Sequence, residues 1–256
     1  MPNKFLGQHW LRDRPILELI VADANLSRDD TVLEIGPGLG TLTSVLLKYA
    51  GSVVAVEFDV EVARKLPGQF PGKNLLVVPG DILTYDLGNL PVGYKVVANI
   101  PYYITKKIIQ SLVRAGNSPE NMVLLMQQEV AEKYAASQGE LTLPAIELQL
   151  SYDVHVSTRV PKMYFIPQPK VDSQVLVCTK KQMRDIAELD KQRILHIAQI
   201  GFSSPRKKLR SSLSGGLSID KSKLEQILHN AVIDPGLRAE DLSISDWVRL
   251  ADILAV

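Results

Sequence analysis

The glycine-rich segment at residues 32–41, with the sequence VLEIGPGLGT, constrains the fold of this chain more than any other feature. A short, mostly apolar run ends at Ile35, glycines follow at positions 36, 38 and 40, and apolar residues then recur at helical spacing. Glycines in such a turn let the backbone come close to a ligand at the N-terminus of a helix. The segment therefore predicts a strand, a ligand-binding turn and a helix.

Periodicity along the rest of the chain predicts an α/β fold followed by a helical region. Strands and helices alternate to about residue 126, which is the pattern of a parallel sheet with crossover helices. Residues 152–160 and 173–179 also have strand-like patterns, and we expect them to form an antiparallel pair that closes the sheet edge. Beyond residue 180 the pattern is only helical. We therefore expect one domain over residues 1–180 and a small all-helical C-terminal domain over residues 181–256.

The expected C-terminal helices are separated by turn residues. Gly215-Gly216 and the Asp-Pro-Gly sequence at 234–236 are typical of breaks between helices. They divide the region into expected helices at about residues 189–202, 207–213, 221–231 and 242–254.

Two carboxylates that follow the next strands indicate a ligand containing adenosine. Glu57 ends the second strand, seventeen residues after Gly40, where it is well placed to accept hydrogen bonds from both ribose hydroxyls. Asp81 follows the third strand, and its carboxylate can accept from the adenine amino group.

The glycine turn departs from the dinucleotide-binding pattern. Its third glycine follows the second by two residues instead of three, and no cation occurs from Gly36 to Val45 to favour a pyrophosphate. Glu34 instead adds a negative charge just before the turn. These features favour S-adenosylmethionine, a sulfonium with an amino acid tail, over a nicotinamide or flavin dinucleotide.

The tetrapeptide Asn99-Ile100-Pro101-Tyr102, at the end of the fourth strand, has the groups needed to alkylate an adenine amino group. That nitrogen is a poor nucleophile because its lone pair is delocalised into the ring. Acceptors for its two N–H bonds, here the Asn99 amide oxygen and the Ile100 carbonyl, turn electron density toward the electrophile. Tyr102 would stack on the base, and Pro101 keeps Ile100 out of the helical region.

Taken in order, these motifs resemble those of the KsgA-type small-subunit rRNA adenine dimethyltransferases over nearly the whole chain. Trp10 stands where that family usually has Phe. The motifs are KFLGQHWL (residues 4–11), the glycine turn, Glu57, Asp81, NIPY (99–102), FIPQPKVDS (165–173) and FSSPRKKLR (202–210).

The resemblance implies the seven-stranded, mostly parallel Rossmann-like sheet of class I methyltransferases. It also implies transfer of methyl groups from S-adenosylmethionine to N6 of two adjacent adenosines in a hairpin loop near the 3′ end of small-subunit rRNA, within a pre-30S-type assembly intermediate. Phe165 lies in a loop bounded by prolines, so we also expect its ring to be exposed and to stack on the face of the target base opposite Tyr102. The residues expected around the cofactor are His9, Leu11, Gly36, Gly38, Glu57, Asp81, Ile82 and Asn99.

The formal net charge of +1 hides a concentrated basic segment at residues 206–210. Arg206, Lys207, Lys208 and Arg210 occur there without an acidic residue. We expect them to lie within about one turn of a helix that starts after Pro205 and to contact RNA phosphates.

Two other functions stay open from the sequence. Large-subunit rRNA methyltransferases of the macrolide-resistance type share the sheet and the Asn-(Ile/Leu)-Pro-Tyr turn, although the segments at 165–173 and 206–210 favour the small-subunit enzymes. The chain could also be a ribosome-assembly or transcription factor that kept the fold and lost the chemistry. The intact Gly36, Glu57, Asp81 and Asn99 argue against that reading.

The composition excludes several other classes. The longest uninterrupted apolar run has five residues, so no membrane span is expected, and the single cysteine cannot form an internal disulfide. Cys178 is expected in the core, and the four dispersed histidines give no metal-binding spacing. We expect a cytoplasmic protein that acts as a monomer, without a metal.

Overall fold

The computed structural model describes residues 9–182 and 188–254, which divide into two compact units. The first comprises residues 1–132 and 153–180, and the second comprises residues 133–152 and 181–256. Residues 133–152 therefore group with the C-terminal helices, although the sequence analysis placed them in the first domain. The reason is that the buried side chains of Leu141, Ala145, Ile146 and Leu150 pack in the hydrophobic core of the helical unit.

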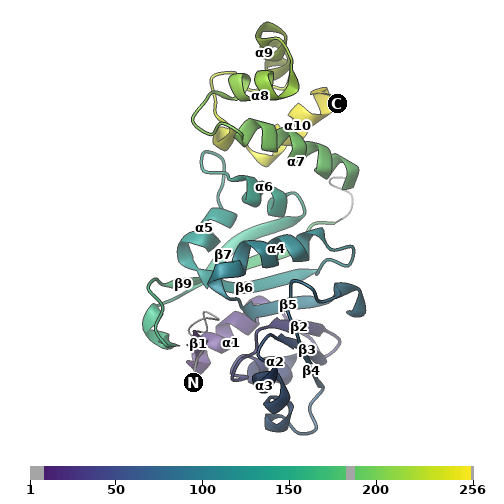
Figure 1. Ribbon diagram of the computed structural model, residues 1–256, viewed down its shortest axis with the longest axis vertical. Helices are drawn as coiled ribbons and strands as arrows, with labels where there is room; N and C mark the ends of the chain where they lie inside the picture. The colour runs from purple at the N-terminus through teal and green to yellow at the C-terminus, as the bar shows by residue number, and fades with distance from the viewer. Residues whose placement is uncertain (1–8, 183–187, 255–256) are drawn as a thin grey trace. The chain divides into compact units, whose positions relative to one another are not determined.

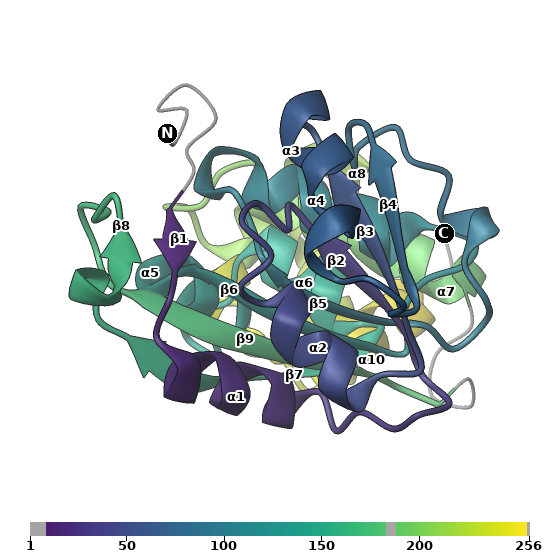
Figure 2. The ribbon, with the colours of Figure 1, turned by 90° about the horizontal axis from the view of Figure 1, so that it is seen from below.

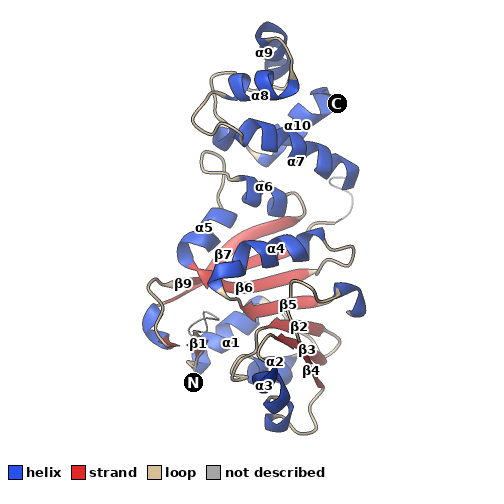
Figure 3. Cartoon of the chain, in the orientation of Figure 1, coloured by secondary structure: helices blue, strands red, loops and turns tan. Residues whose placement is uncertain are grey.

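The first unit is built on a seven-stranded sheet, visible as the red strands in Figure 3. Its order is β4-β3-β2-β5-β6-β9-β7. The neighbours from β4 to β6 are parallel, and β9 runs antiparallel to β6. The strand bounds are β2 Thr31–Ile35, β3 Ser52–Glu57, β4 Leu75–Pro79, β5 Lys95–Asn99, β6 Asn121–Gln127, β7 Tyr152–Val160 and β9 Ser173–Lys180. The expected seven-stranded, mostly parallel sheet is confirmed, with β7 and β9 adjacent at one edge.

The strand order reverses between β2 and β5. From β2 the chain proceeds to β3 and β4 on one side of the sheet, and it then returns to place β5 and β6 on the other side. Ligands of open parallel sheets bind outside the carboxyl ends of the strands at such a switch point. The glycine turn follows β2, and the Asn99 tetrapeptide begins at the end of β5. The topology therefore brings the two motifs together.

Helices α1 (Arg14–Asp23) and α2 (Thr43–Tyr49) lie side by side against one face of the sheet (Figures 1 and 2). Their apolar side chains pack with alternate strand residues such as Val32, Val97 and Val123 in one core cluster. Helix α1 begins where the Asp13 carboxylate accepts from the Ile16 N–H at 3.1 Å. The other helices of this region are α3 (Val60–Lys65), α4 (Thr105–Arg114) and α5 (Gln128–Tyr134).

The second unit contains helices packed around Trp247, whose side chain is fully buried. The unit contains α6 (Leu143–Gln149), α7 (Glu188–Phe202), α8 (Leu209–Leu217), α9 (Lys221–Asn230) and α10 (Ile244–Leu254). None of the helices in the described residues has the length and apolarity that crossing a membrane requires.

Two expectations for the helical unit are wrong. Gly215 and Gly216 lie inside α8 and do not end a helix. A Cβ added at Gly216 would lie 2.2 Å from Cγ2 of Ile200, so this glycine allows α8 to pack closely against α7. Helix α8 also begins at Leu209 instead of residue 207.

Candidate active site

A cavity of about 260 Å³ lies at the carboxyl ends of the central strands in the first unit. It brings together residues that are far apart in the sequence and that the sequence analysis selected for separate reasons. Those residues are His9, Gly36, Gly38, Glu57, Asp81, Ile82, Asn99, Ile100, Pro101 and Tyr102.

The glycine turn has the backbone conformation that only glycine adopts easily. The φ angles of Gly36, Gly38 and Gly40 are +66°, +53° and +76°. Each of the three N–H groups donates to a protein acceptor: to Val56 O at 2.9 Å, to Glu57 Oε2 at 3.0 Å and to Pro37 O at 2.9 Å, respectively. Two of these hydrogen bonds fix the turn to β3, and the third closes it on itself.

The Glu57 carboxylate is buried at the end of β3 and is held by two main-chain donors. Oε2 accepts from the Gly38 N–H, and Oε1 accepts from the Asp59 N–H at 2.9 Å. Each oxygen has a second lone pair. A rigid acceptor of this kind suits a pair of ribose hydroxyls.

Glu34 lies beneath the turn with 1% of its surface exposed. Burial raises the pKa of its carboxyl to about 8; the Thr43 hydroxyl, which donates to Oε2 at 2.6 Å, opposes that rise, and the nearby Glu57 charge adds to it. Glu34 is therefore mostly protonated at neutral pH, and the negative charge expected just before the turn is largely absent.

Asp81 follows β4, the strand next to β3 in the sheet, and lines the same cavity as Glu57. Its Oδ1 accepts from the Leu83 N–H at 2.9 Å, and the preceding Gly80 N–H donates to the Glu57 carbonyl at 2.8 Å. These two hydrogen bonds fix the loop that carries Asp81 beside the end of β3, where Glu57 lies.

The Asn99 amide is oriented by the N-terminal segment. Its Nδ2 donates to the His9 carbonyl at 2.9 Å, which leaves Oδ1 as the acceptor for a ligand amino group. The next residue, Ile100, is fixed through its N–H, which donates to the Leu125 carbonyl at 3.1 Å, and its side chain is buried. Pro101 has φ −62° and ψ 126°, as expected for a residue that turns the chain after a strand.

Tyr102 begins the short 3₁₀ helix η4 (Tyr102–Ile104), and its ring is held at two points. The phenol shares a 2.6 Å hydrogen bond with the buried Ser173 hydroxyl, and the His9 ring stacks on it with centroids 5.6 Å apart. His9 Nδ1 in turn donates to the Pro167 carbonyl at 2.7 Å. Burial raises the pKa of Tyr102, with the Ser173 hydrogen bond opposing, so the phenol stays neutral.

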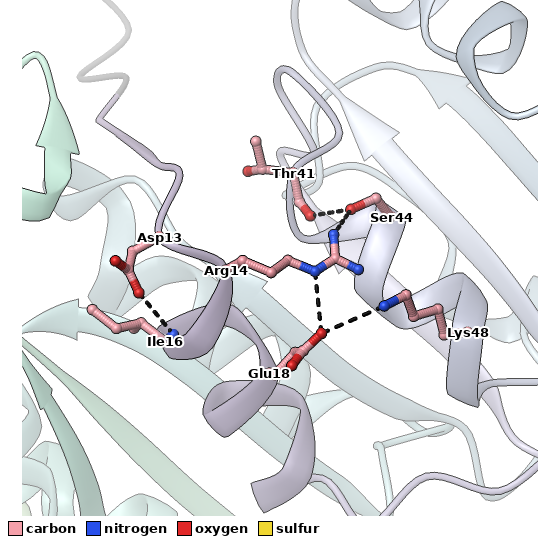
Figure 4. Close-up of polar contacts among 7 residues, drawn as sticks. All are labelled: Asp13, Arg14, Ile16, Glu18, Thr41, Ser44 and Lys48. Atoms are coloured by element: carbon pink, nitrogen blue, oxygen red, sulfur yellow. Dashed lines mark hydrogen bonds and ion pairs between the residues drawn. The ribbon is translucent and has the colours of Figure 1, made fainter.

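Hydrogen bonds connect the segment after His9 to the end of the glycine turn. The Thr41 hydroxyl donates to the Leu11 carbonyl at 2.9 Å, and the Ser44 hydroxyl donates to the Thr41 carbonyl at 2.7 Å. Figure 4 shows Arg14 between Ser44 and Glu18, with Nη1 2.8 Å from the Ser44 hydroxyl. Lys48 reaches the same Glu18 carboxylate from α2, which ties α1 to α2.

Two predicted site residues have other positions. Leu11 is 2% exposed and packs in the core, so that it does not line the cavity. Phe165 is also 2% exposed and pairs with Leu11 in the two-stranded sheet formed by β1 (Trp10–Leu11) and β8 (Phe165–Ile166). The expectation of an exposed Phe165 ring for base stacking is wrong, because the Pro-bounded loop folds that ring into the core. The first part of the N-terminal motif, residues 4–8, lies outside the described residues.

The sequence analysis missed several residues that line the cavity. Most are sequence neighbours of predicted ones, and adjacency to a motif at a strand end is the signal that could have found them. They are Trp10, Ile35, Val56, Phe58, Gly80, Leu83, Tyr103 and Ile104.

The basic segment at residues 206–210 belongs to the helical unit and differs from its expected form. Arg206, Lys207 and Lys208 are exposed, but they precede α8 and share no helical turn. The Lys207 N–H closes a turn onto the Ser204 carbonyl, and Lys208 is extended. Arg210 lies within α8 and forms an ion pair with Glu225 of α9. The expectation that all four cations lie in one helical turn is therefore wrong.

Cys178 has the expected position in the core, where burial raises the pKa of its thiol far above the ordinary value. Among the described residues, no group of His, Cys, Asp and Glu side chains is arranged to hold a metal ion.

Comparison with known proteins places this geometry in a family. The family model for ribosomal RNA adenine dimethylase matches residues 2–256. The ribosomal RNA small subunit methyltransferase A of Nostoc sp. is 40% identical, covering 100% of this chain and 98% of the relative. That of Ligilactobacillus salivarius is 38% identical, covering 98% and 90%.

Two solved structures are similar over almost their whole length. The 23S rRNA methyltransferase ErmE has a TM-score of 0.82 and 27% identity, covering 96% of this chain and 100% of that one. A dimethyladenosine transferase from Plasmodium falciparum has a TM-score of 0.82 and 26% identity, covering 94% and 96%. The full-length match to the family model and the 40% identity to curated relatives agree with the cavity and the sheet. This chain belongs to the ribosomal RNA adenine dimethylase family.

Proposed function

We propose that this chain transfers methyl groups from S-adenosylmethionine to N6 of two adjacent adenosines in a hairpin loop near the 3′ end of small-subunit rRNA. The observation that carries the proposal is the single cavity that joins Glu57 and Asp81 to Asn99 and Tyr102. One pair of these residues has the chemistry to hold an adenosine cofactor. The other pair has the chemistry to hold a target adenine.

The cavity suits S-adenosylmethionine better than a dinucleotide. Glu57 would accept from the ribose hydroxyls, and Asp81 would accept from the adenine amino group of the cofactor. No lysine or arginine occurs among the described residues that line the cavity, so a pyrophosphate would lack a counter-charge there. Two carboxylates favour a ligand that carries a sulfonium and an ammonium group.

The residues of the tetrapeptide would position the base without a strong general base. Asn99 Oδ1 and the Ile100 carbonyl would accept the two N6–H bonds, and Tyr102 would stack on the ring. Bound S-adenosylmethionine supplies a methyl group on a good leaving group. The N6–C bond forms as the C–S bond breaks, and the amino proton then leaves to water. Repetition at the same nitrogen gives dimethyladenosine.

The exposed cations of the basic segment would bind rRNA phosphates within an assembly intermediate of the small subunit. Arg206, Lys207 and Lys208 are all exposed and lie in consecutive positions. Arg210 contributes less to this proposal because Glu225 already neutralises it. We place the reaction in the cytoplasm and assign it to a monomer.

The two alternatives have less support. The relatives near 40% identity carry a small-subunit name, whereas the 23S rRNA methyltransferase ErmE is 27% identical. A non-catalytic role would give no reason to keep Asn99 oriented by His9 and Tyr102 held by Ser173.

The test is mass spectrometry of rRNA after incubation of the protein with labelled S-adenosylmethionine and unmethylated ribosomal particles. We expect dimethyladenosine in small-subunit rRNA at two adjacent positions and none in large-subunit rRNA. Asn99→Ala should abolish the product, whereas Asn230→Ala, an exposed control in α9, should not. Label in large-subunit rRNA would favour the macrolide-resistance type of activity, and no label in either RNA would contradict the proposal.

A further inference from the structure

Tyr103 lies at the opening of the cavity. It lines the cavity, and yet 64% of its surface is exposed. The preceding residue, Tyr102, is instead held by the Ser173 hydroxyl and the His9 ring. A lone exposed aromatic side chain is ordinary on a protein surface, but this one forms part of the candidate active site. Its ring is therefore available to a molecule that enters the cavity or emerges from it.

Two exposed cations follow Tyr103 in the sequence. Lys106 and Lys107 are three and four residues further on, in the first turn of α4. Because η4 runs directly into α4, Tyr103 lies within about one helical turn of both cations. Helix α4 contains no acidic residue. An aromatic ring beside such positive charge is the combination with which proteins bind single-stranded nucleic acids.

The proposed reaction leaves a base that needs such a surface. Asn99 and Tyr102 would hold one adenine in the cavity, which requires that adenine to leave its stack in the RNA. The base of the adjacent nucleotide then loses a stacking neighbour, although it lies only one phosphodiester link from the cavity. Tyr103 follows Tyr102 in the chain and lies where that nucleotide emerges.

The second exposed aromatic residue of the cavity belongs to its cofactor side. Phe58 is 59% exposed and directly follows Glu57, which would bind the ribose of the cofactor. Tyr103 instead directly follows the tetrapeptide that would bind the target base. Its place in the chain therefore associates Tyr103 with the RNA.

We propose that Tyr103 stacks on the base of the nucleotide next to the target adenosine, while Lys106 and Lys107 bind phosphates of the same strand. This inference rests on the proposed function and identifies the part of the RNA that the cavity opening contacts. Stacking on an aromatic ring accepts any base. The same ring can therefore serve both methylation events, whichever nucleotide adjoins the target.

Reconstituted small-subunit particles test the stacking contact. A synthetic 3′ segment of the rRNA introduces an abasic site on the 5′ side or on the 3′ side of one target adenosine. Tyr103→Ala should lower kcat/KM for methylation of the intact particle by about 5-fold to 100-fold, the range for loss of one base–aromatic stack. Tyr103→Phe keeps the ring and should stay within about twofold, as should Tyr49→Ala, an exposed tyrosine of α2.

The abasic particles decide whether the ring contacts the neighbouring base. One of the two abasic sites should slow the unmodified protein about as much as Tyr103→Ala does on the intact particle. On that same particle, Tyr103→Ala should cost less than about a further twofold, because the contact is already lost.

Three results would contradict a part of this account, and they are distinguishable. A full additional loss from Tyr103→Ala on both abasic particles would overturn the stacking contact. Weaker binding of S-adenosylhomocysteine, the demethylated cofactor, by Tyr103→Ala would place the ring in the cofactor site and would also overturn it. Failure of the unmodified protein to methylate the intact particle would instead contradict the proposed function.

The phosphate contacts have a readout of their own. Lys106→Ala combined with Lys107→Ala should make the slope of log K against log salt for particle binding shallower by about one to two units. The matched pair Lys221→Ala with Lys223→Ala, exposed cations of α9, should leave the slope unchanged. Equal slopes for the two double variants would overturn the role of Lys106 and Lys107.

Discussion

The cavity and the basic segment present their functional side chains in opposite ways. In the cavity, main-chain groups hold the Glu57 carboxylate and the Asn99 amide, and Ser173 holds the Tyr102 hydroxyl. In the basic segment, Arg206, Lys207 and Lys208 are exposed on a turn and an extended residue that precede α8. A fixed side chain can position a reacting atom, whereas an exposed cation contributes mainly charge.

Single substitutions should therefore have different effects in the two regions. Chemistry that depends on one oriented amide should fail when that amide is removed. Binding that is shared among several phosphate contacts should decline gradually as cations are removed. Substitutions in the two regions should therefore separate these two behaviours.

Asn99→Ala should lower the methyl-transfer rate at saturating RNA and cofactor by about 100-fold or more, the range found when one preorganised polar group is removed from an active site. The physical reason is that Oδ1 is the acceptor left after Nδ2 donates to the His9 carbonyl. Single-turnover kinetics measures the rate, with Asn230→Ala as the control. Near-normal turnover would show that residues 99–102 form only a turn.

Glu34→Gln should flatten the pH dependence of stability. The folded-state pKa of about 8 lies above the ordinary 4.5, so between these values the folded protein binds a proton that the unfolded chain lacks. The free energy of unfolding of the unmodified protein should therefore fall as pH rises from about 5 to 8, on the order of a few kcal/mol.

Urea unfolding at pH 5, 6.5 and 8 measures this dependence. Glutamine keeps an uncharged side chain of the same size beside Thr43, so the variant should lose most of the decline, whereas the exposed control Glu140→Gln should retain it. If both variants decline like the unmodified protein, Glu34 does not carry the proton.

Glu57→Ala should weaken binding of S-adenosylhomocysteine by about 1–3 kcal/mol, the range for hydrogen bonds to a charged group. The substitution also removes the acceptor of the Gly38 and Asp59 N–H groups, so thermal unfolding has to accompany the calorimetry. Tight binding of NAD by the unmodified protein would contradict the cofactor assignment altogether.

Replacement of Arg206, Lys207 and Lys208 by alanine should weaken RNA binding gradually and make it less dependent on salt. The slope of log K against log salt for RNA binding should become shallower by about 2–3 units, one phosphate contact per cation. Cofactor affinity and thermal stability should stay the same, because these side chains are exposed. The matched control is Lys221→Ala with Lys223→Ala, two exposed cations of α9.

Substitution of Arg210, the fourth cation, tests whether this segment docks RNA or packs against the helical unit. Arg210→Ala should lower thermal stability slightly, because it removes the ion pair with Glu225, and should change the salt slope less than the other three cations do. A stability loss from the triple variant, with an unchanged salt slope, would show that the segment packs and does not dock RNA.

Short motifs at strand ends predicted much of the fold and the cavity. Gly36, Glu57, Asp81 and Asn99 could be placed together because parallel strands deliver their carboxyl ends to one edge of the sheet. Periodicity likewise identified the strands of the seven-stranded sheet, but it did not identify the two short strands β1 and β8.

The errors concern features that depend on distant packing. Phe165 looked exposed because its loop is rich in proline, yet β8 pairs with β1 and buries it. Gly216 looked like a helix break, but the side chain of Ile200 fills the space that a Cβ would need.

The most direct test measures two quantities for each variant on unmethylated small-subunit particles. One is the affinity for the particle, and the other is the methyl-transfer rate at saturation. Asn99→Ala should lose the rate and keep the affinity, because the phosphates hold most of the RNA. The triple variant of Arg206, Lys207 and Lys208 should keep the rate and lose affinity. If both variants lose rate and affinity together, the division between a positioned cavity and a charged docking segment is wrong.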